Sequence, residues 1–230
     1  MAAIYLIRHA QASFGFGDYD NLSRIGLEQA HVLGEAMRMR VANVDAVVAG
    51  AMKRHRQTAS ICLDTMACTT PRIEDDGWNE YDHDELIERA QPRYANKLFM
   101  KLDLARTLQP KKAFQRFFIR AVERWVGGEH DADYREPWSA FCVRVEAALA
   151  RLVARLDREQ TAFVFTSGGP ITAICAARLA LSGCDALRLN WPLVNGGVTK
   201  LVSTARGVHV STFNEHGHFE GERKALLTFR

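Results

Sequence analysis

The sequence lacks long hydrophobic runs. Nowhere do about eighteen apolar residues follow one another, which is the length that a helix needs to cross a bilayer. The start of the chain, Met1–Ile4, has neither the basic region nor the apolar stretch of a signal peptide. We therefore expect a cytoplasmic protein with no membrane partner.

Cysteine is also scarce, and its spacing does not indicate a metal site. The five cysteines are odd in number and contain no Cys-x-x-Cys pair, which argues against zinc and against a disulfide scaffold. The sequence has no P-loop and no cluster of metal-ligating residues, so we expect neither a metal nor a cofactor. The formal net charge of +3 is too weak to indicate a nucleic-acid partner.

The chain does have enough apolar residues for one large core. With 230 residues, 47% of them hydrophobic, it is predicted to form a single domain. Short buried strands alternate with amphipathic helices, which predicts an α/β fold with an open sheet. Strands are predicted over 3–7, 44–48 and 161–166, and marginally at 72–73. Helices are predicted over 24–40, 57–66, 138–156 and 171–181. We also predict a glycine-rich loop over 12–20 and an antiparallel hairpin over 193–202 and 207–213.

Residues 84–136 interrupt this alternation. Their pattern is helical, contains no strand and is broken by Pro92 and Pro110, so we interpret the segment as an inserted helical cap. Between Lys97 and Arg124 basic residues greatly outnumber acidic ones. Such a run is most often a solvated face, but where it faces a site it favours an anionic substrate.

Three predicted strands end on residues suited to binding an anion. Arg8 and His9 follow the first strand, the basic cluster Lys53–Arg56 follows the second, and Gly168 and Gly169 follow the strand over 161–166. In an open α/β sheet the ligand crevice lies outside the carboxyl ends of the strands. Taken singly, these residues also fit a surface ion pair, a solvated helix start and a tight turn. Taken together, they predict a pocket for a tetrahedral dianion such as phosphate.

The order of these motifs resembles the histidine phosphatase superfamily, which has the phosphoglycerate-mutase-like fold. The Arg-His-Gly signature stands here as Arg8-His9-Ala10, the characteristic helix start as the segment from Leu22 to Ala30, and the second pocket arginine with its Thr-Ala as the segment from Arg54 to Ala59. The resemblance covers nearly the whole chain outside the cap. It implies a three-layer α/β/α sandwich whose sheet is mostly parallel with an antiparallel edge.

The resemblance also implies a role for individual residues. His9 is the residue that becomes phosphorylated, Arg8 and Arg54 hold the phosphoryl oxygens, and Glu80 donates a proton to the leaving group. Without the resemblance, Glu80 is equally well explained as a loop carboxylate that pairs with a cation. Further substrate-binding residues implied by the resemblance or by their place near the pocket are Gln11, Gly168, Gly169 and Asn195.

One position departs from the family pattern. The Ser-His-Gly-Gly signature stands as Thr166-Ser167-Gly168-Gly169, so Ser167 replaces the second histidine. His83 and His55 lie near pocket residues in the sequence and are the candidates to take its place. A serine hydroxyl donates an uncharged hydrogen bond, about half as strong as that from a protonated imidazole, so we expect slow turnover.

The function that these observations favour is that of a metal-independent phosphatase acting on a small phosphorylated substrate. The alternative is a catalytically weakened protein of the same fold that binds a phosphorylated ligand or inorganic phosphate. A sugar-phosphate mutase is the least favoured, because it needs a phosphoenzyme protected from water and a second anchor. No motif specifies the substrate or an oligomeric state.

Overall fold

The computed structural model describes residues 1–13 and 20–229, which contain one mixed six-stranded sheet. Its order is β3-β2-β4-β1-β5-β6. Strands β1 to β4 are parallel to one another, β5 is antiparallel to β1, and β6 is antiparallel to β5. The predicted parallel sheet with an antiparallel edge is therefore confirmed. Most of the predicted glycine-rich loop lies outside the described residues. The strands are β1 (Ala2–Arg8), β2 (Ala46–Ala49), β3 (Arg72–Glu74), β4 (Thr161–Thr166), β5 (Val198–Thr204) and β6 (Gly207–Glu215).

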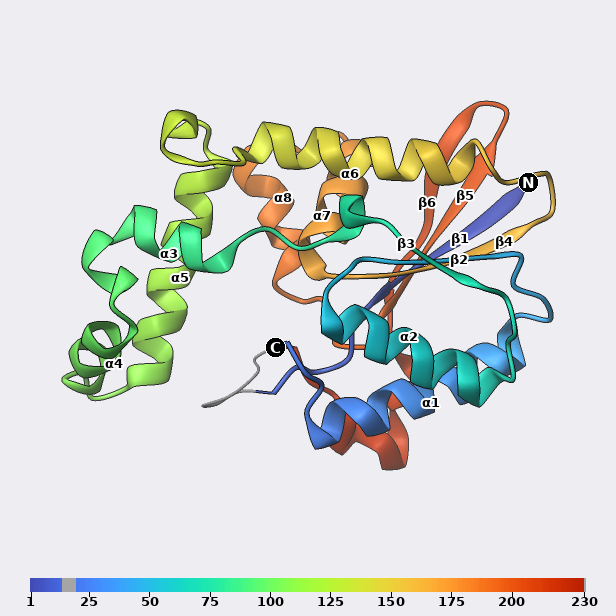
Figure 1. The fold of residues 1–230 in the computed structure, drawn as a ribbon, viewed down its shortest axis with the longest axis horizontal. Helices are drawn as coiled ribbons and strands as arrows, with labels where there is room; N and C mark the ends of the chain where they lie inside the picture. Colours follow the sequence, from blue (N-terminus) through green and yellow to red (C-terminus); the bar gives the residue numbers. More distant parts are fainter. Residues whose placement is uncertain (14–19, 230) are drawn as a thin grey trace.

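Helices cover both faces of the sheet and complete the three predicted layers (Figure 1). Ile4 and Leu6 of β1 belong to a core shared with α6 (Trp138–Val153) and α7 (Gly168–Arg178). Tyr5 and Ile7 point the other way, into a core shared with α1 (Arg24–Arg40) and α2 (Lys53–Met66). This alternation is the two-residue period of a strand that is buried on both faces.

Helix α1 has the predicted bounds because its start carries clear signals. Ser23 is the N-cap, and its Oγ accepts the N–H of Gly26 at 3.0 Å. A Cβ on Gly26 would lie only 2.2 Å from the carbonyl oxygen of Gln11, so a glycine is needed there. The start of α1 is thereby packed directly against the segment that follows β1.

Two other helices begin earlier than predicted. Helix α2 starts at Lys53 rather than Gln57, so the basic cluster forms its first turn. Helix α7 starts at Gly168 rather than Ile171, so the two glycines and Pro170 form its first turn. Proline is tolerated there because the first N–H groups of a helix have no partner within the helix. Both helix starts therefore lie directly at the ends of the parallel strands.

The predicted cap segment is helical and lies beyond the end of the sheet at which the parallel strands finish (Figure 1). Trp125 connects α5 to the rest of the molecule, with its ring centroid 4.8 Å from that of Tyr81 and 5.4 Å from that of Phe141 on α6. No residue of α4 is buried. The segment contains α3 (His83–Ala90), α4 (Lys97–Ala105) and α5 (Pro110–Val126), with short 3-10 turns at Pro92–Ala95 and Asp131–Asp133.

The remaining elements are short. Helix α8 (Gly183–Asn190) packs against α7, and 3-10 turns occur at Asp76–Trp78, Gly217–Phe219 and Gly221–Leu226. The predicted hairpin is present, although β5 begins at Val198 rather than Leu193. Within the described part of the chain, no helix combines the length and the apolar character needed to span a membrane.

Candidate active site

His9 is the first residue after β1, and only 8% of it is exposed. Its backbone N–H donates to the carbonyl of Thr166, which joins the ends of β1 and β4. Its Nδ1 lies 2.7 Å from the carbonyl oxygen of Ala10. Because a carbonyl oxygen can only accept, Nδ1 carries the hydrogen and Nε2 keeps its lone pair. Burial, followed by the charge of Arg54, holds the pKa of His9 well below its ordinary value, which favours the neutral form of the ring.

Arg54 lies in the first turn of α2 and is only 3% exposed. Its Nη1 donates to Oδ1 of Asp20 at 2.8 Å. Its Nε is buried and has no hydrogen-bond partner among the described residues. Thr58 fixes this turn against the segment after β1, because its Oγ1 accepts the N–H of Ala10 and donates to the carbonyl of Arg54. A buried guanidinium with one unused donor can bind an anion.

Arg8 is the last residue of β1. Its Nη1 donates to the carbonyl of Phe229 at 2.9 Å and also to the carbonyl of Leu193. These two carbonyls hold the guanidinium beside the start of α7, where a Cβ on Gly168 would lie 3.8 Å from Nε of Arg8. Both predicted arginines are therefore held at the ends of β1 and β2 by contacts that fix their direction.

Glu80 lies between β3 and α3, and its carboxylate meets the start of α7. The N–H of Gly169 donates to Oε2 at 3.2 Å, and the N–H of Tyr81 donates to Oε1 at 3.3 Å. Burial raises the pKa of Glu80, against the lowering effects of the Gly169 N–H and of Arg54 and Arg8. A carboxyl group with a raised pKa keeps its proton to higher pH and can act as an acid. The predicted anion donor Gly169 thus has its N–H engaged by Glu80.

Ser167 is fully buried at the junction of β4 and α7. Its Oγ lies 2.6 Å from Nε2 of His55, which is fully buried as well. The ring centroids of His55 and His9 are 5.6 Å apart. The structure thus brings together Ser167, which is predicted to replace the family's second histidine, and one of the two histidines predicted as candidates to take its place.

Two other predicted pocket residues form hydrogen bonds with neighbouring segments of the chain. Gln11 accepts the hydroxyl of Ser23 with Oε1 at 2.8 Å, which links the end of β1 to the start of α1. Asn195 donates from Nδ2 to the carbonyl of His9 at 3.3 Å and accepts the hydroxyl of Thr228 at 3.1 Å. The Asn195 side chain thus contacts the His9 backbone directly, and the Gln11 side chain holds the segment after β1 against α1.

His83, the second candidate, is the first residue of α3. Its ring packs against Tyr81, with the centroids 4.6 Å apart, and against Phe118 of α5 at 5.6 Å. These aromatic contacts belong to the junction between the cap and the sheet. Of the two candidate histidines, His55 is the one that we find within hydrogen-bond distance of Ser167, among the contacts described above.

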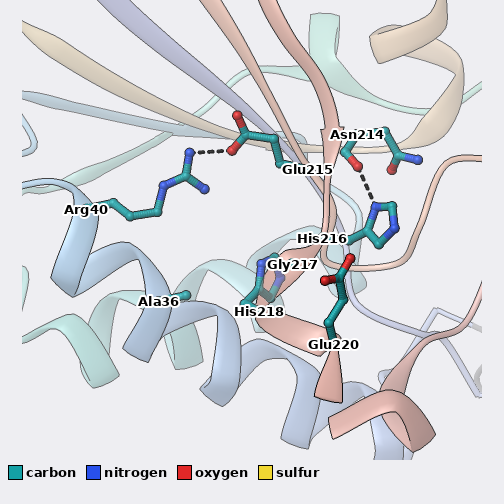
Figure 2. Close-up of a pocket in the computed structure, with 8 residues that line it drawn as sticks. All are labelled: Ala36, Arg40, Asn214, Glu215, His216, Gly217, His218 and Glu220. Carbon is teal, nitrogen blue, oxygen red and sulfur yellow. Dashed lines mark hydrogen bonds and ion pairs between the residues drawn. The ribbon is translucent and has the colours of Figure 1, made fainter.

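A surface hollow elsewhere in the molecule does not suit phosphate. It lies between α1 and the segment that follows β6 (Figure 2). The Arg40 guanidinium in it makes an ion pair with Glu215, and Nδ1 of His216 lies 2.6 Å from the carbonyl oxygen of Asn214. With Glu220 also in its lining, the hollow has no excess of positive charge to hold a dianion.

The protein thus has an α/β fold in which two arginines and a histidine lie at the ends of parallel strands. The family model of the histidine phosphatase superfamily (branch 1) matches residues 4–216, and the chain belongs to this superfamily. No curated protein matches the chain.

Solved structures that are similar to the chain include a mutase and phosphatases. Phosphoglycerate mutase from Bacillus anthracis str. Sterne is 15% identical, with 94% of each chain covered and a TM-score of 0.66. A mutant phosphoserine phosphatase from Entamoeba histolytica in complex with phosphoserine is 15% identical, with 95% of this chain and 99% of that chain covered and a TM-score of 0.65. A mycobacterial glucosyl-3-phosphoglycerate phosphatase with inorganic phosphate is 18% identical, with 94% and 98% covered and a TM-score of 0.59. At these identities the likeness shows a common fold.

Proposed function

We propose that the protein is a metal-independent phosphatase that hydrolyses a small phosphomonoester through a phosphohistidine on His9. The observation that carries this proposal is the hydrogen bond from Nδ1 of His9 to the carbonyl of Ala10, which leaves the lone pair of Nε2 available. The guanidinium of Arg54, with its unused Nε donor, supplies charge beside this ring. Similar structures carry phosphoserine or inorganic phosphate, which supports a small phosphorylated ligand.

The proposed reaction has two steps. In the first, Nε2 of His9 attacks phosphorus, the bond between phosphorus and the ester oxygen breaks, and Glu80 gives its proton to that oxygen. In the second, water attacks phosphorus, the bond to Nε2 breaks with its electron pair returning to the ring, and the Glu80 carboxylate takes the proton from water. Arg8 and Arg54 stabilise the charge on the phosphoryl oxygens in both steps. The products are an alcohol and inorganic phosphate.

A phosphate-binding protein of the same fold is the second candidate, and Ser167 is the observation that favours it. Loss of one preorganised donor typically costs about 10²–10³ in rate. A serine acting alone at this position would therefore make turnover slow. Whether the turnover rate of this protein is lowered in this way depends on the hydrogen-bond donors around Ser167.

The experiment that separates the two candidates is turnover of p-nitrophenyl phosphate by the wild type and by His9→Ala. We expect turnover in the wild type and none in His9→Ala, with the same melting temperature in both. His31→Ala is the matched control, because His31 is exposed on α1 and should be dispensable. Rapid quenching of the wild type with radiolabelled substrate should trap a label that is stable in alkali and labile in acid, as phosphohistidine is.

Two outcomes would change the assignment. Binding of phosphate without any turnover in the wild type would make the protein a phosphate-binding member of the superfamily. Undiminished turnover in His9→Ala would remove His9 as the nucleophile.

A further inference from the structure

The site contains a second buried imidazole that the reaction described above does not use. His55 has no exposed surface, and its ring centroid lies 5.6 Å from that of His9. It follows Arg54 directly in the first turn of α2, so the same turn brings a guanidinium and an imidazole to the ends of the strands. A buried imidazole is a costly choice for packing alone, because its two ring nitrogens lose their hydrogen bonds to water.

The space for this ring is provided by the end of β2. A Cβ on Gly50 would lie 2.4 Å from Nδ1 of His55, so a side chain at position 50 would displace the ring. The backbone here is fixed, since the N–H of Gly50 donates to the carbonyl of Phe165 and the N–H of Ala51 donates to Oδ1 of Asn79. The ring of His55 thus fills a recess lined by ordered backbone.

Ser167 also departs from the usual behaviour of its position. It is the N-cap of α7, where a serine side chain normally accepts an N–H from the first turn of the helix. No such bond forms here, because the N–H of Gly169 donates to Glu80 and Oγ of Ser167 lies instead 2.6 Å from Nε2 of His55. The Ser167 hydroxyl is therefore oriented toward His55 and not toward the first turn of α7.

The register of the sheet sets this pair beside the nucleophile. Arg8 of β1 is paired with Thr166 of β4, so His9 and Ser167 are the next residues on two neighbouring parallel strands. A group bound to Nε2 of His9 lies at these strand ends, where Ser167 and His55 meet. A neutral His55 with its hydrogen on Nε2 donates to Oγ of Ser167, which leaves the hydroxyl hydrogen for a phosphoryl oxygen.

We propose that His55 supplies the second imidazole of the site and, with Ser167 as its partner, provides a hydrogen bond to the transferring phosphoryl group. The inference rests on the proposed phosphatase function and deepens it. It assigns to helix α2 a group that the family's sequence pattern carries at the end of β4. A phosphoryl dianion close to the ring would also favour its protonation, which strengthens the hydrogen bond when substrate is bound.

The test moves the imidazole from the first turn of α2, at position 55, to the end of β4, at position 167. We expect His55→Ala to lower kcat by about 10²–10³, with a smaller change in KM, since the lost donor acts mainly on the transition state. Ser167→His alone should also be slow, because the new ring needs the space that His55 occupies. The double variant His55→Ala with Ser167→His should regain much of the rate lost in His55→Ala. A residue that only fills space would not be rescued by an imidazole placed on another element.

The same assay separates this inference from the proposed function. Melting temperature and binding of inorganic phosphate are measured for each variant, and His55→Gln replaces His55→Ala if the alanine variant does not fold. If His9→Ala is inactive but folded His55→Ala keeps the wild-type kcat, His55 has no role in turnover. A folded double variant no faster than His55→Ala overturns the inference as well. Activity in His9→Ala would instead defeat the phosphatase mechanism itself.

Discussion

Glu80 and Gly169 fit together so closely that a side chain at position 169 would displace the Glu80 carboxylate. The N–H of Gly169 donates to Oε2 of Glu80 at 3.2 Å, and a Cβ on Gly169 would lie 2.0 Å from Oε1. The same Cβ would lie 2.9 Å from Cδ1 of Tyr81. The first turn of α7 therefore determines where the acid of the site is held.

Gly169→Ala should consequently have the same effect on the rate as a substitution of Glu80, the proposed acid. We expect kcat for an alkyl phosphate to fall by about 10²–10⁴, the range that general acid catalysis contributes, because the methyl group displaces the Glu80 carboxyl. The loss for p-nitrophenyl phosphate should be much smaller, since its leaving group needs no proton. Gly217→Ala is the control, because a Cβ there meets no atom within 4 Å. Equal losses for the two substrates would contradict a role for Glu80 as proton donor.

The pH dependence of kcat/KM should reflect the opposite pKa shifts of His9 and Glu80, the proposed nucleophile and the proposed acid. Burial and Arg54 hold the pKa of His9 well below 6.5, so activity should persist into mildly acidic solution before the ring is protonated. Burial raises the pKa of Glu80 above 4.5, and activity should fall as pH rises through that raised pKa and the acid form is lost. We expect Glu80→Gln to lower the rate and remove the alkaline limb. An alkaline limb that persists in Glu80→Gln would assign it to another group.

Stability should also depend on pH through His9 and His55. The pKa of each is held below its ordinary value of 6.5, chiefly by burial, so the unfolded chain binds more protons than the folded one in weakly acidic solution. Their contribution to stability is complete above about pH 6.5 and is lost as pH falls toward the folded-state values, by at most about 1.4 kcal/mol per pH unit for each ring. Urea denaturation of the wild type and of His55→Gln between pH 7 and pH 5 measures this slope. The slope should be shallower in His55→Gln than in the wild type, and an equal slope in both would contradict this contribution of His55.

The sequence predicts the elements whose ends carry local signals. Ser23 gives the start of α1 because its side chain caps the helix, and the apolar runs give β1 and β4. Helix α2 starts earlier than predicted because its N-cap, Met52, makes no side-chain capping bond and so leaves no sequence signal. Helix α7 starts earlier than predicted for a different reason, because Gly168 and Gly169, which also fit a tight turn, form its first turn together with Pro170.

The candidate site is predictable only as far as the ends of the strands. Arg8, His9 and Arg54 follow from the rule that ligands bind outside the carboxyl ends of parallel strands. The contact between His55 and Ser167 joins residues 112 positions apart and depends on how the first turn of α2 faces β4, which periodicity does not specify. The hydrogen bond of Asn195 to the His9 backbone is likewise a product of tertiary packing.

The contacts of Arg8 have a consequence for the order in which the protein folds during its synthesis. Its carbonyl partners, Leu193 and Phe229, are 185 and 221 residues further along the chain. During synthesis from the amino end, β1 and its arginine leave the ribosome long before either partner exists. The set of contacts around Arg8 at this end of the sheet can therefore be completed only after residue 229 has emerged. A nascent chain stalled before that residue would carry His9 and Arg8 without the contacts that orient the guanidinium.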